Sequence, residues 1–440
     1  MKDKVRDAAL RFLCDAERDG KYINLALPSG LAQFTDPRDR ALFTLLVYGV
    51  TERAITLDYY IERFSSRPLG ELERFTKYIL RLGFYQILYL NTPSHAAVNE
   101  TVSLARQTGE RGFVNAVLRA YLRAPEVALP EKKDGVIPYL SVRYSFPEWI
   151  CRSFVEDYGE EKAEKLLAAL CCRAPLTLRV NTLRTTREAL LARLAEYSPE
   201  KTPFSPNGIL LRGDLVPSFL PGFDSGDYLI QDEASQLAAE LLGAVPGSTA
   251  CDVCAAPGSK SLAVAMGMAN EGKLWAFDLH RSKLPLIEEG ARRFGCTIIE
   301  AAVQNALQPR AKLRGKVDFL LCDTPCSGLG VAAKKPDVRR KGEKEVKELP
   351  ELSYAILDAS AAYLRAGGRM VFSTCTLRRA ENEEVAERFL REHPDFQPED
   401  FVFRAEDGRE LRSENGMLTL LPHITGTDGF FLSRFRRKGE

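Results

Sequence analysis

The sequence has no uninterrupted apolar run long enough to span a bilayer, and its N-terminus, MKDKVRDAALRFLCDAERDG, lacks the apolar core of a secretion signal. Neither a membrane protein nor a secreted one is therefore expected. Its ten cysteines lack the regular framework of a small disulfide-stapled domain, which a chain of 440 residues does not need. We expect free thiols and a cytoplasmic location. The sequence leaves the oligomeric state open, with a monomer favoured.

Zinc ligands are also scarce. The chain has four histidines, and Cys251 and Cys254 form a CxxC pair with no second pair at the spacing of a four-ligand site. We therefore expect no bound metal.

A strong excess of charge is missing as well. Sixty-one Lys and Arg residues balance 60 Asp and Glu residues, so the formal net charge is +1 and no global basic field draws nucleic acid to the protein. RNA contact must then come from local basic runs, each of which is more often a solvated face. Three runs are candidates: Lys334, Lys335, Arg339, Arg340 and Lys341; Arg378 and Arg379; and Arg434, Arg436, Arg437 and Lys438.

At this length two or three domains are expected. Residues 1–128 show helical patterns nearly throughout, and ERFTKYILRLGFYQILYL is apolar on more than one face, which predicts a central buried helix. Thr92 and Pro93 form a candidate N-cap and first position for the helix through HAAVNETVSLAR, and another helix is expected through GFVNAVLRAYLR. A linker is predicted around three prolines, Pro125, Pro130 and Pro138.

The rest of the chain divides into two expected parts. Residues 141–226 combine helical segments with the β-like run LTLRVN, which predicts a small α/β module. From residue 227 onward, apolar runs at TACDVCA, KLWAFDL, VDFLLCD and GRMVFST alternate with helical stretches, as in a doubly wound parallel sheet. Ligands bind at the carboxyl ends of the strands in such sheets, so the chemistry is expected where these four runs end.

The residues at the carboxyl ends of the first two apolar runs indicate a nucleotide site. DVCAAPGSKS places small residues and Gly258 at a strand-to-helix turn, where the backbone can approach a ligand and the helix offers unpaired N–H groups. The motif is neither GxGxxG nor a P-loop, so alone it is equally consistent with a tight turn. Asp278, twenty positions later, stands where such sheets place the carboxylate that accepts the ribose hydroxyls; the alternative is a helix N-cap.

The carboxyl ends of the third and fourth apolar runs are each followed by a cysteine. CDTPCSGLG contains Asp323 and Cys326, and STCTL contains Cys375. A cysteine is ordinarily a small buried hydrophobe, but the flanking Pro, Ser, Gly and Thr residues indicate exposed turns here. A thiolate suits methylation of cytosine at C5, because its addition to C6 raises the electron density at C5 and the sulfur leaves afterwards. A sulfonium donor in the nucleotide site would supply the methyl group.

In this order the motifs resemble those of the RNA cytosine-5 methyltransferases, specifically the RsmB (Sun, Fmu) family that modifies 16S ribosomal RNA. DVCAAPGSK resembles the family's cofactor loop, DTPCSGLG the motif with the assisting cysteine, and STCTLRRAENEEV the nucleophile motif. RLGFYQILYL, HAAVNETVSLAR and GFVNAVLR resemble its NusB-like helical domain, and QDEASQLAA and GTDGFFLSRF match positions flanking the catalytic sheet. The resemblance implies a multidomain fold: an all-α NusB-like domain at 1–128, a small α/β module at 141–226 and a doubly wound, Rossmann-like methyltransferase domain at 227–440.

The resemblance also implies a role for each site residue. Cys375 is the nucleophile, Cys326 assists release of the methylated base, and Asp323 lies between the cofactor and the cytosine, where it hydrogen-bonds the ring. Asp278 takes the ribose hydroxyls of S-adenosylmethionine, and Asn305 takes its adenine. The loop expected to line the methionine and ribose part comprises Cys254, Ala255, Ala256, Pro257, Gly258, Ser259 and Lys260.

Several positions depart from the family pattern. Ser259 replaces a second glycine and Thr324 replaces an alanine, and both are small. Asn305 replaces an aspartate; its amide oxygen still accepts a hydrogen bond from adenine, but weaker binding is expected for want of charge. The stretch VAAKKPDVRRKGEKEVKEL is less aromatic than the family's version, which leaves the detail of RNA docking open.

Three functions remain open from the sequence. The favoured one is methylation of C5 of a cytosine unstacked from 16S ribosomal RNA, through a covalent adduct of Cys375 with C6. The second keeps the chemistry but acts on transfer RNA, and only the NusB-like N-terminus argues against it. The third is a non-catalytic RNA-binding or assembly factor, against which both cysteines and Asp323 argue.

Overall fold

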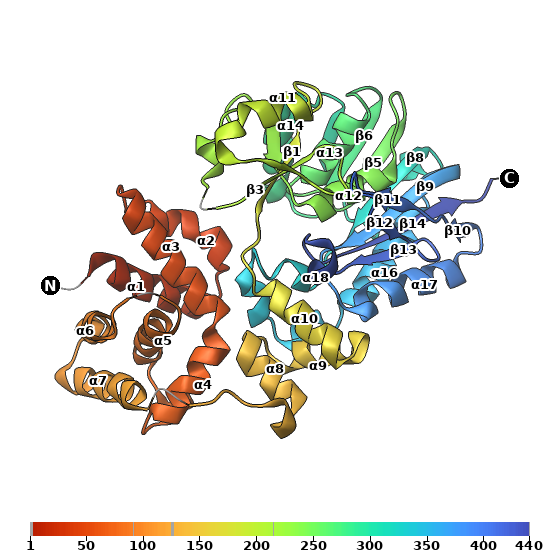
Figure 1. The fold of residues 1–440 in the computed structure, drawn as a ribbon. Coiled ribbons are helices and arrows are strands. Elements are labelled where there is room, and N and C mark those ends of the chain that lie inside the picture. Colours follow the sequence, from red (N-terminus) through yellow and green to blue (C-terminus); the bar gives the residue numbers. More distant parts are fainter. Residues whose placement is uncertain (1–2, 91, 125–126, 214, 440) are drawn as a thin grey trace. The chain divides into compact units, whose positions relative to one another are not determined.

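The structure is a computed structural model that describes residues 3–90, 92–124, 127–213 and 215–439. Contacts within the chain divide it into two compact units (Figure 1). The first comprises residues 1–171 together with 334–343, and the second comprises residues 172–333 and 344–440. The domain boundaries expected at residues 128, 141 and 226 stay a prediction. No helix in the described ranges is both long and apolar enough to cross a membrane.

The first unit is helical. Short 3-10 turns and loops connect its helices, which are α1 Lys4–Asp19, α2 Ile23–Leu31, α3 Pro37–Glu52, α4 Ala54–Phe64, α5 Arg74–Tyr89, α6 Ser94–Leu104, α7 Thr108–Arg123, α8 Val136–Tyr144, α9 Glu148–Tyr158 and α10 Glu160–Leu170.

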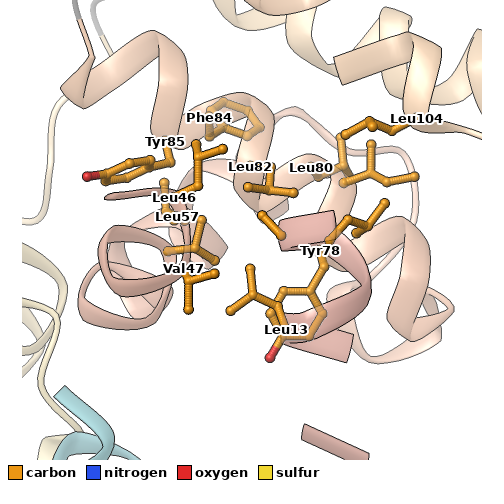
Figure 2. Packing of buried hydrophobic residues seen from close by; sticks show 14 of the residues in the cluster. Leu13, Leu46, Val47, Leu57, Tyr78, Leu80, Leu82, Phe84, Tyr85 and Leu104 are labelled. Atoms are coloured by element: carbon orange, nitrogen blue, oxygen red, sulfur yellow. The ribbon is translucent and has the colours of Figure 1, made fainter. Parts of the chain in front are cut away.

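The predicted central helix is α5, and its burial is confirmed. Side chains on more than one of its faces are buried, including Leu80, Leu82 and Phe84, because α1, α3, α4, α6 and α7 all pack against it. Figure 2 shows these residues among leucine and valine side chains from the surrounding helices. Since burying one such side chain stabilises by about 1.5–3 kcal/mol, the buried faces of α5 contribute substantially to the stability of this bundle.

Two details of the helix boundaries differ from the prediction. The N-cap of α6 is Pro93, and no side chain caps its first turn, so Thr92 does not have the expected capping role. Pro138 lies in the first turn of α8, where the missing N–H of proline has no helical partner to lose. The predicted linker is therefore shorter than the prolines indicate, and Pro125 lies outside the described residues.

Residues 334–343 follow the Cys326 motif in sequence but pack inside the first unit. Arg339, only 5% exposed, donates to the carbonyl oxygens of Glu52 (3.0 Å), Tyr144 (3.4 Å) and Leu170 (2.9 Å). These are the last residues of α3, α8 and α10, so one guanidinium caps three helix C-termini. Asp337 accepts from the backbone N–H of Asn24 (3.2 Å) in the first turn of α2, which no local side chain caps.

The second unit contains two main sheets. The smaller is antiparallel, in the order β2-β3-β1-β4, with β1 Leu176–Val180 formed by the predicted run LTLRV, β2 Glu200–Lys201, β3 Gly208–Leu211 and β4 Tyr228–Ile230. The helix α11 Arg187–Arg193 accompanies it. The larger sheet has the order β10-β14-β9-β8-β5-β6-β7, with β13 paired to β14, and a separate two-stranded ribbon joins β11 to β12.

Each of the four predicted apolar runs forms a strand of the larger sheet, and β9, β8, β5, β6 and β7 are parallel. The sheet is mixed, because β14 runs antiparallel to β9. The strands are β5 Thr249–Asp252, β6 Lys273–Asp278, β7 Ile299–Val303, β8 Val317–Asp323, β9 Leu364–Thr374, β10 Phe396–Pro398, β13 Met417–Leu420 and β14 Phe430–Arg437, with β11 Val402–Arg404 and β12 Glu410–Arg412 in the ribbon.

Successive strand residues enter different cores on opposite faces of this sheet. Leu321 and Val371 join the cluster that contains α12 Glu233–Leu242 and α13 Ser259–Gly267. Their neighbours Leu320 and Met370 join the cluster of α16 Leu349–Ala361 and α17 Glu383–Glu392. Helices on both faces confirm the doubly wound, Rossmann-like prediction; α14 Leu284–Phe294, α15 Glu343–Val346 and α18 Pro422–Thr425 complete the helices.

Candidate functional site

The predicted functional residues follow the carboxyl ends of four adjacent parallel strands. The strands β9, β8, β5 and β6 are neighbours in this order, and their last residues are Thr374, Asp323, Asp252 and Asp278. The loops that carry the predicted cofactor and cysteine motifs therefore start at one edge of the sheet, as expected for a ligand site in this architecture.

The two predicted cysteines meet. Cys326 Sγ and Cys375 Sγ are 3.4 Å apart, within hydrogen-bonding distance for sulfur, and both residues are half-buried. The hydrogen bond with Cys375, together with burial, raises the pKa of the Cys326 thiol well above its usual value. Cys326 therefore keeps its proton, and either sulfur can donate in this contact. By contrast, Cys251 and Cys322 lie fully buried on strands as small apolar side chains.

A polar triad lies beside the cysteine loops. Lys260 Nζ is 2.7 Å from Asp323 Oδ2, and Ser373 Oγ donates to Asp323 Oδ1 at 2.7 Å. Ser373 reaches this carboxylate because it is the residue paired with Asp323 in the parallel register of β8 and β9. Although burial opposes it, the charge of Asp323 raises the pKa of Lys260, so the ammonium stays protonated. Lys260 thus connects the predicted cofactor loop to Asp323, and its predicted contact with the cofactor stays a prediction.

Side chains that were not predicted as site residues hold the two cysteine loops together. Glu381, which is fully buried, accepts from the Ser327 N–H at 2.7 Å and pairs with Arg378 at 3.0 Å. Ser327 and Thr376, the residues after the two cysteines, share a hydrogen bond of 2.6 Å between their hydroxyls. The Gly330 N–H donates to the Cys375 carbonyl at 3.0 Å. These residues all lie in the motifs DTPCSGLG and STCTLRRAENEEV. Their position in the two cysteine motifs was the only feature of the sequence that could have indicated their role.

The cofactor loop has the features of a ligand cradle. Gly258 has a φ of +108° and a Cβ there would lie 3.3 Å from the backbone of Ile287, so both conformation and space favour glycine. No side chain caps α13, which begins at Ser259, so its first N–H groups have no side-chain acceptor among the described contacts. Asp252 accepts from Ser261 Oγ at 2.6 Å behind the loop, and burial raises its pKa to about 7. These features fit S-adenosylmethionine at this loop.

The two outer residues predicted to bind the cofactor follow the next strands. Asp278 ends β6 and accepts from the His280 N–H at 2.9 Å through Oδ1, so among the described contacts Oδ2 stays available to a ligand. Asn305 follows β7, and its side-chain oxygen accepts from the Leu307 N–H at 3.0 Å. Thr324, which replaces the usual alanine, is accommodated because its hydroxyl lies 2.9 Å from that of Ser353 on α16.

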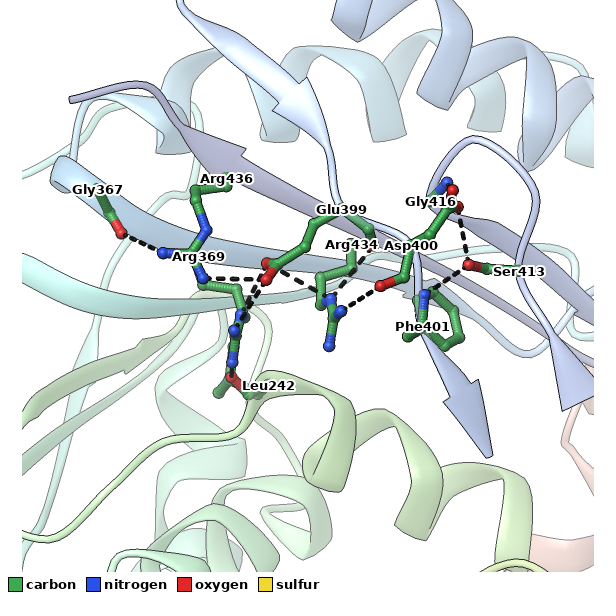
Figure 3. Close-up of polar contacts among 10 residues, drawn as sticks. All are labelled: Leu242, Gly367, Arg369, Glu399, Asp400, Phe401, Ser413, Gly416, Arg434 and Arg436. Atoms are coloured by element: carbon green, nitrogen blue, oxygen red, sulfur yellow. Dashed lines mark hydrogen bonds and ion pairs between the residues drawn. The ribbon is translucent and has the colours of Figure 1, made fainter. Parts of the chain in front are cut away.

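Several members of the predicted basic runs have partners within the protein. Figure 3 shows Glu399 bound by arginines of two strands, Arg369 of β9 and Arg434 and Arg436 of β14. Although burial opposes it, these arginines lower the pKa of Glu399 to about 2. Arg437 pairs with Asp395 at 3.2 Å. Together with the buried Arg339, these contacts contradict a simple reading of the runs as RNA-facing charge.

The sheet order and the cofactor loop define the class of the protein as a Rossmann-like methyltransferase that uses S-adenosylmethionine. Within this class, the family described as 16S rRNA methyltransferase RsmB/F matches residues 239–436. The NusB family matches residues 3–123, and the ferredoxin-like domain of RsmF/B-like methyltransferases matches residues 146–216.

Full-length relatives agree with these domain matches. The probable ribosomal RNA small subunit methyltransferase B of Bacillus subtilis is 37% identical over 100% of both chains. The ribosomal RNA small subunit methyltransferase B of Citrobacter koseri is 28% identical over 99% of this chain and 100% of that one. The chain therefore belongs to the RsmB/F methyltransferase family, which confirms the predicted family and its NusB-like domain.

Solved structures support the fold. The crystal structure of PH0851 has a TM-score of 0.79 at 23% identity and covers 99% of this chain and 100% of that chain. NSun6 from Pyrococcus horikoshii, crystallised with SFG, has a TM-score of 0.59 at 21% identity and covers 68% of this chain and all of its own.

Proposed function

We propose that this protein methylates C5 of a cytosine in 16S ribosomal RNA, with Cys375 as the covalent nucleophile. The observation that carries the proposal is the 3.4 Å approach of Cys326 and Cys375 beside the ion pair of Lys260 and Asp323. Ribosomal RNA of the small subunit is named as the substrate of full-length relatives, which favours it over transfer RNA.

Lys260 and Asp323 suit the pairing edge of cytosine. This edge presents one donor, the N4 amino group, and two acceptors, N3 and O2, which match a carboxylate and an ammonium. Addition of a thiolate to C6 delivers negative charge to the ring, and the Lys260 ammonium offsets that charge in a partly buried setting. Only an unstacked base exposes these atoms, so the target cytosine has to leave its stack.

Cys375 opens the reaction by forming a bond from Sγ to C6, which breaks the C5–C6 double bond and places its electron pair on C5. S-adenosylmethionine, when bound, supplies the electrophilic methyl group that C5 takes. A base then removes the C5 proton, the double bond re-forms, and the bond between C6 and Sγ breaks. Cys326 assists this last step, because its retained proton hydrogen-bonds the departing Cys375 thiolate.

The cofactor is assigned to the loop of residues 254–260, with Asp278 on the ribose hydroxyls and Asn305 on the adenine. The positive φ of Gly258, the uncapped start of α13 and the available Oδ2 of Asp278 support this assignment. An amide at residue 305 supplies an acceptor without charge, which is sufficient for the adenine amino group.

The two cysteines are tested by substitution, using unmodified 16S ribosomal RNA transcript and a labelled methyl donor. Cys375→Ala is expected to lower methylation by at least about 10³-fold, because the nucleophile is lost. Cys326→Ala is expected to accumulate a covalent protein–RNA complex, visible as a retarded band on a denaturing gel, because release is impaired. The double variant is expected to form no such band.

Cys296→Ala serves as the control, since Cys296 is buried in the same unit as a packing residue. It should methylate like the wild type. Normal turnover of Cys326→Ala without any adduct would contradict the assigned roles, and methylation of transfer RNA but not of the ribosomal transcript would contradict the substrate.

A further inference from the structure

A cavity of about 360 Å³ opens on the first unit, which holds none of the residues assigned to methyl transfer. Two helices line it, α6 with His95, Val98 and Asn99, and α7 with Arg119, Leu122 and Arg123. The volume falls in the range of pockets that bind small ligands.

The cavity is cationic. Arg119 donates from Nε to the amide oxygen of Asn115 at 2.9 Å, and neither it nor Arg123 has a carboxylate within 4.0 Å in the described part of the chain. Other arginines of this unit are neutralised by close acids, in the pairs Arg11–Asp7, Arg18–Asp15 and Arg81–Asp58. From Arg111 to Arg123, α7 contains three arginines and no acidic residue. This face therefore presents cations that are free to bind an anion.

Apolar and amide groups lie between the cations. Leu122 is half-buried and supplies an accessible apolar surface, whereas Val98 is almost fully buried in the lining; Asn99 is exposed and offers both a donor and an acceptor. Guanidinium groups bind phosphate through paired N–H donors and stack on flat rings. A nucleotide is recognised by three kinds of group: cations that bind its phosphate, an apolar surface that packs on its base, and an amide that hydrogen-bonds the edge of the base. This cavity presents all three.

We propose that this cavity binds one unstacked nucleotide of the substrate RNA, with Arg119 and Arg123 on its phosphate and Leu122 against its base. The proposal rests on the proposed function in that the RNA is 16S ribosomal RNA. A base held in a duplex is stacked on both faces and does not enter, so the bound segment is single-stranded or looped.

The test is the double variant Arg119→Ala and Arg123→Ala of the full chain, with binding to 16S ribosomal RNA transcript measured without a methyl donor. The dissociation constant is expected to rise about 10-fold at 0.15 M salt, and the slope of log affinity against log salt to fall by about 1–2. In methylation assays KM should rise while kcat stays within about twofold. A single-stranded oligonucleotide should compete for the wild-type protein better than duplex RNA of equal length.

The control is the double variant Arg11→Ala and Arg18→Ala, which removes the same charge from the same unit but at sites neutralised by Asp7 and Asp15. An unchanged dissociation constant and salt slope for the cavity variant, or an equal loss in the control, would overturn the proposal. Loss of binding to partly assembled subunits with normal binding to naked RNA would overturn it too, because a protein would then be the occupant. Wild-type binding without methylation would contradict the proposed function instead.

Discussion

The three-helix cap formed by Arg339 allows a quantitative test, the substitution Arg339→Met. Methionine keeps much of the apolar volume but donates no hydrogen bond, which leaves the carbonyls of Glu52, Tyr144 and Leu170 without this partner. Each buried acceptor left unsatisfied costs about 1–3 kcal/mol, and relief from burying the guanidinium charge offsets part of the loss. We expect the free energy of unfolding of the first unit to fall by about 2–4 kcal/mol.

The two tryptophans of the chain make this loss measurable. Trp149 lies on α9 in the first unit and donates from Nε1 to the Lys341 carbonyl at 3.0 Å, whereas Trp275 lies on β6 in the second unit. In a Trp275→Phe background, fluorescence therefore reports the first unit alone. With a urea m-value of about 1–3 kcal/mol per M, the midpoint should fall by about 1–2 M.

Two further variants sharpen the test. Arg340→Met changes the exposed neighbour and should leave the midpoint in place. Arg339→Lys should lie between the wild type and Arg339→Met, because an ammonium lacks the planar fork that reaches three carbonyls. An unchanged midpoint for Arg339→Met, or an equal shift for Arg340→Met, would refute the energetic role given to the cap.

Two more predictions concern the second unit. Burial raises the pKa of Glu233, which accepts from the N–H groups of Phe204 (2.5 Å) and Ser205 (2.8 Å), to about 7. A carboxyl with a raised folded-state pKa disfavours folding once it ionises, so the free energy of unfolding should fall by about 2–4 kcal/mol as pH rises from about 4.5 to 7. In urea titrations, Glu233→Gln should reduce this dependence of stability on pH. An unchanged pH dependence would exclude Glu233 as its source. Gly330→Ala would place a Cβ 1.9 Å from the Gly429 carbonyl oxygen and 2.9 Å from that of Cys375, so methylation should be lost. Gly267→Ala is the control, because the space around Gly267 is open and this variant should remain active. An active Gly330→Ala would show that the Cys375 turn tolerates displacement.

The sequence alone predicted those features of the fold that depend on the periodicity of apolar residues or on the position of a residue at the end of a strand. Apolar residues around all of α5 predicted a buried helix, and four short apolar runs predicted β5, β6, β8 and β9. Once parallel strands are assumed, their carboxyl ends have to share one edge, which is why the sequence alone placed Cys326 and Cys375 together.

Side-chain partners that depend on register or on distant chain segments could not be predicted. Ser373 binds Asp323 only because β8 and β9 are paired in that register, and β7 lacks the continuous apolar run that revealed the other strands. Arg339 belongs to a basic run that a sequence reading assigns to solvent. Its burial depends on helix ends that lie between 169 and 287 residues away in sequence, which no local pattern reports.

The late position in the sequence of residues 334–343, which belong to the first unit, has a consequence for synthesis. The ten α-helices found in the described residues up to 171 are translated first, yet the segment that closes three of their ends is translated only by residue 343, a further 172 residues along. At ordinary elongation rates the nascent bundle would wait on the order of 10–30 s with those carbonyls open to water. A truncated fragment that stops at residue 171 would remain permanently in this incomplete state, so a faithful isolated bundle has to be supplied with the missing peptide.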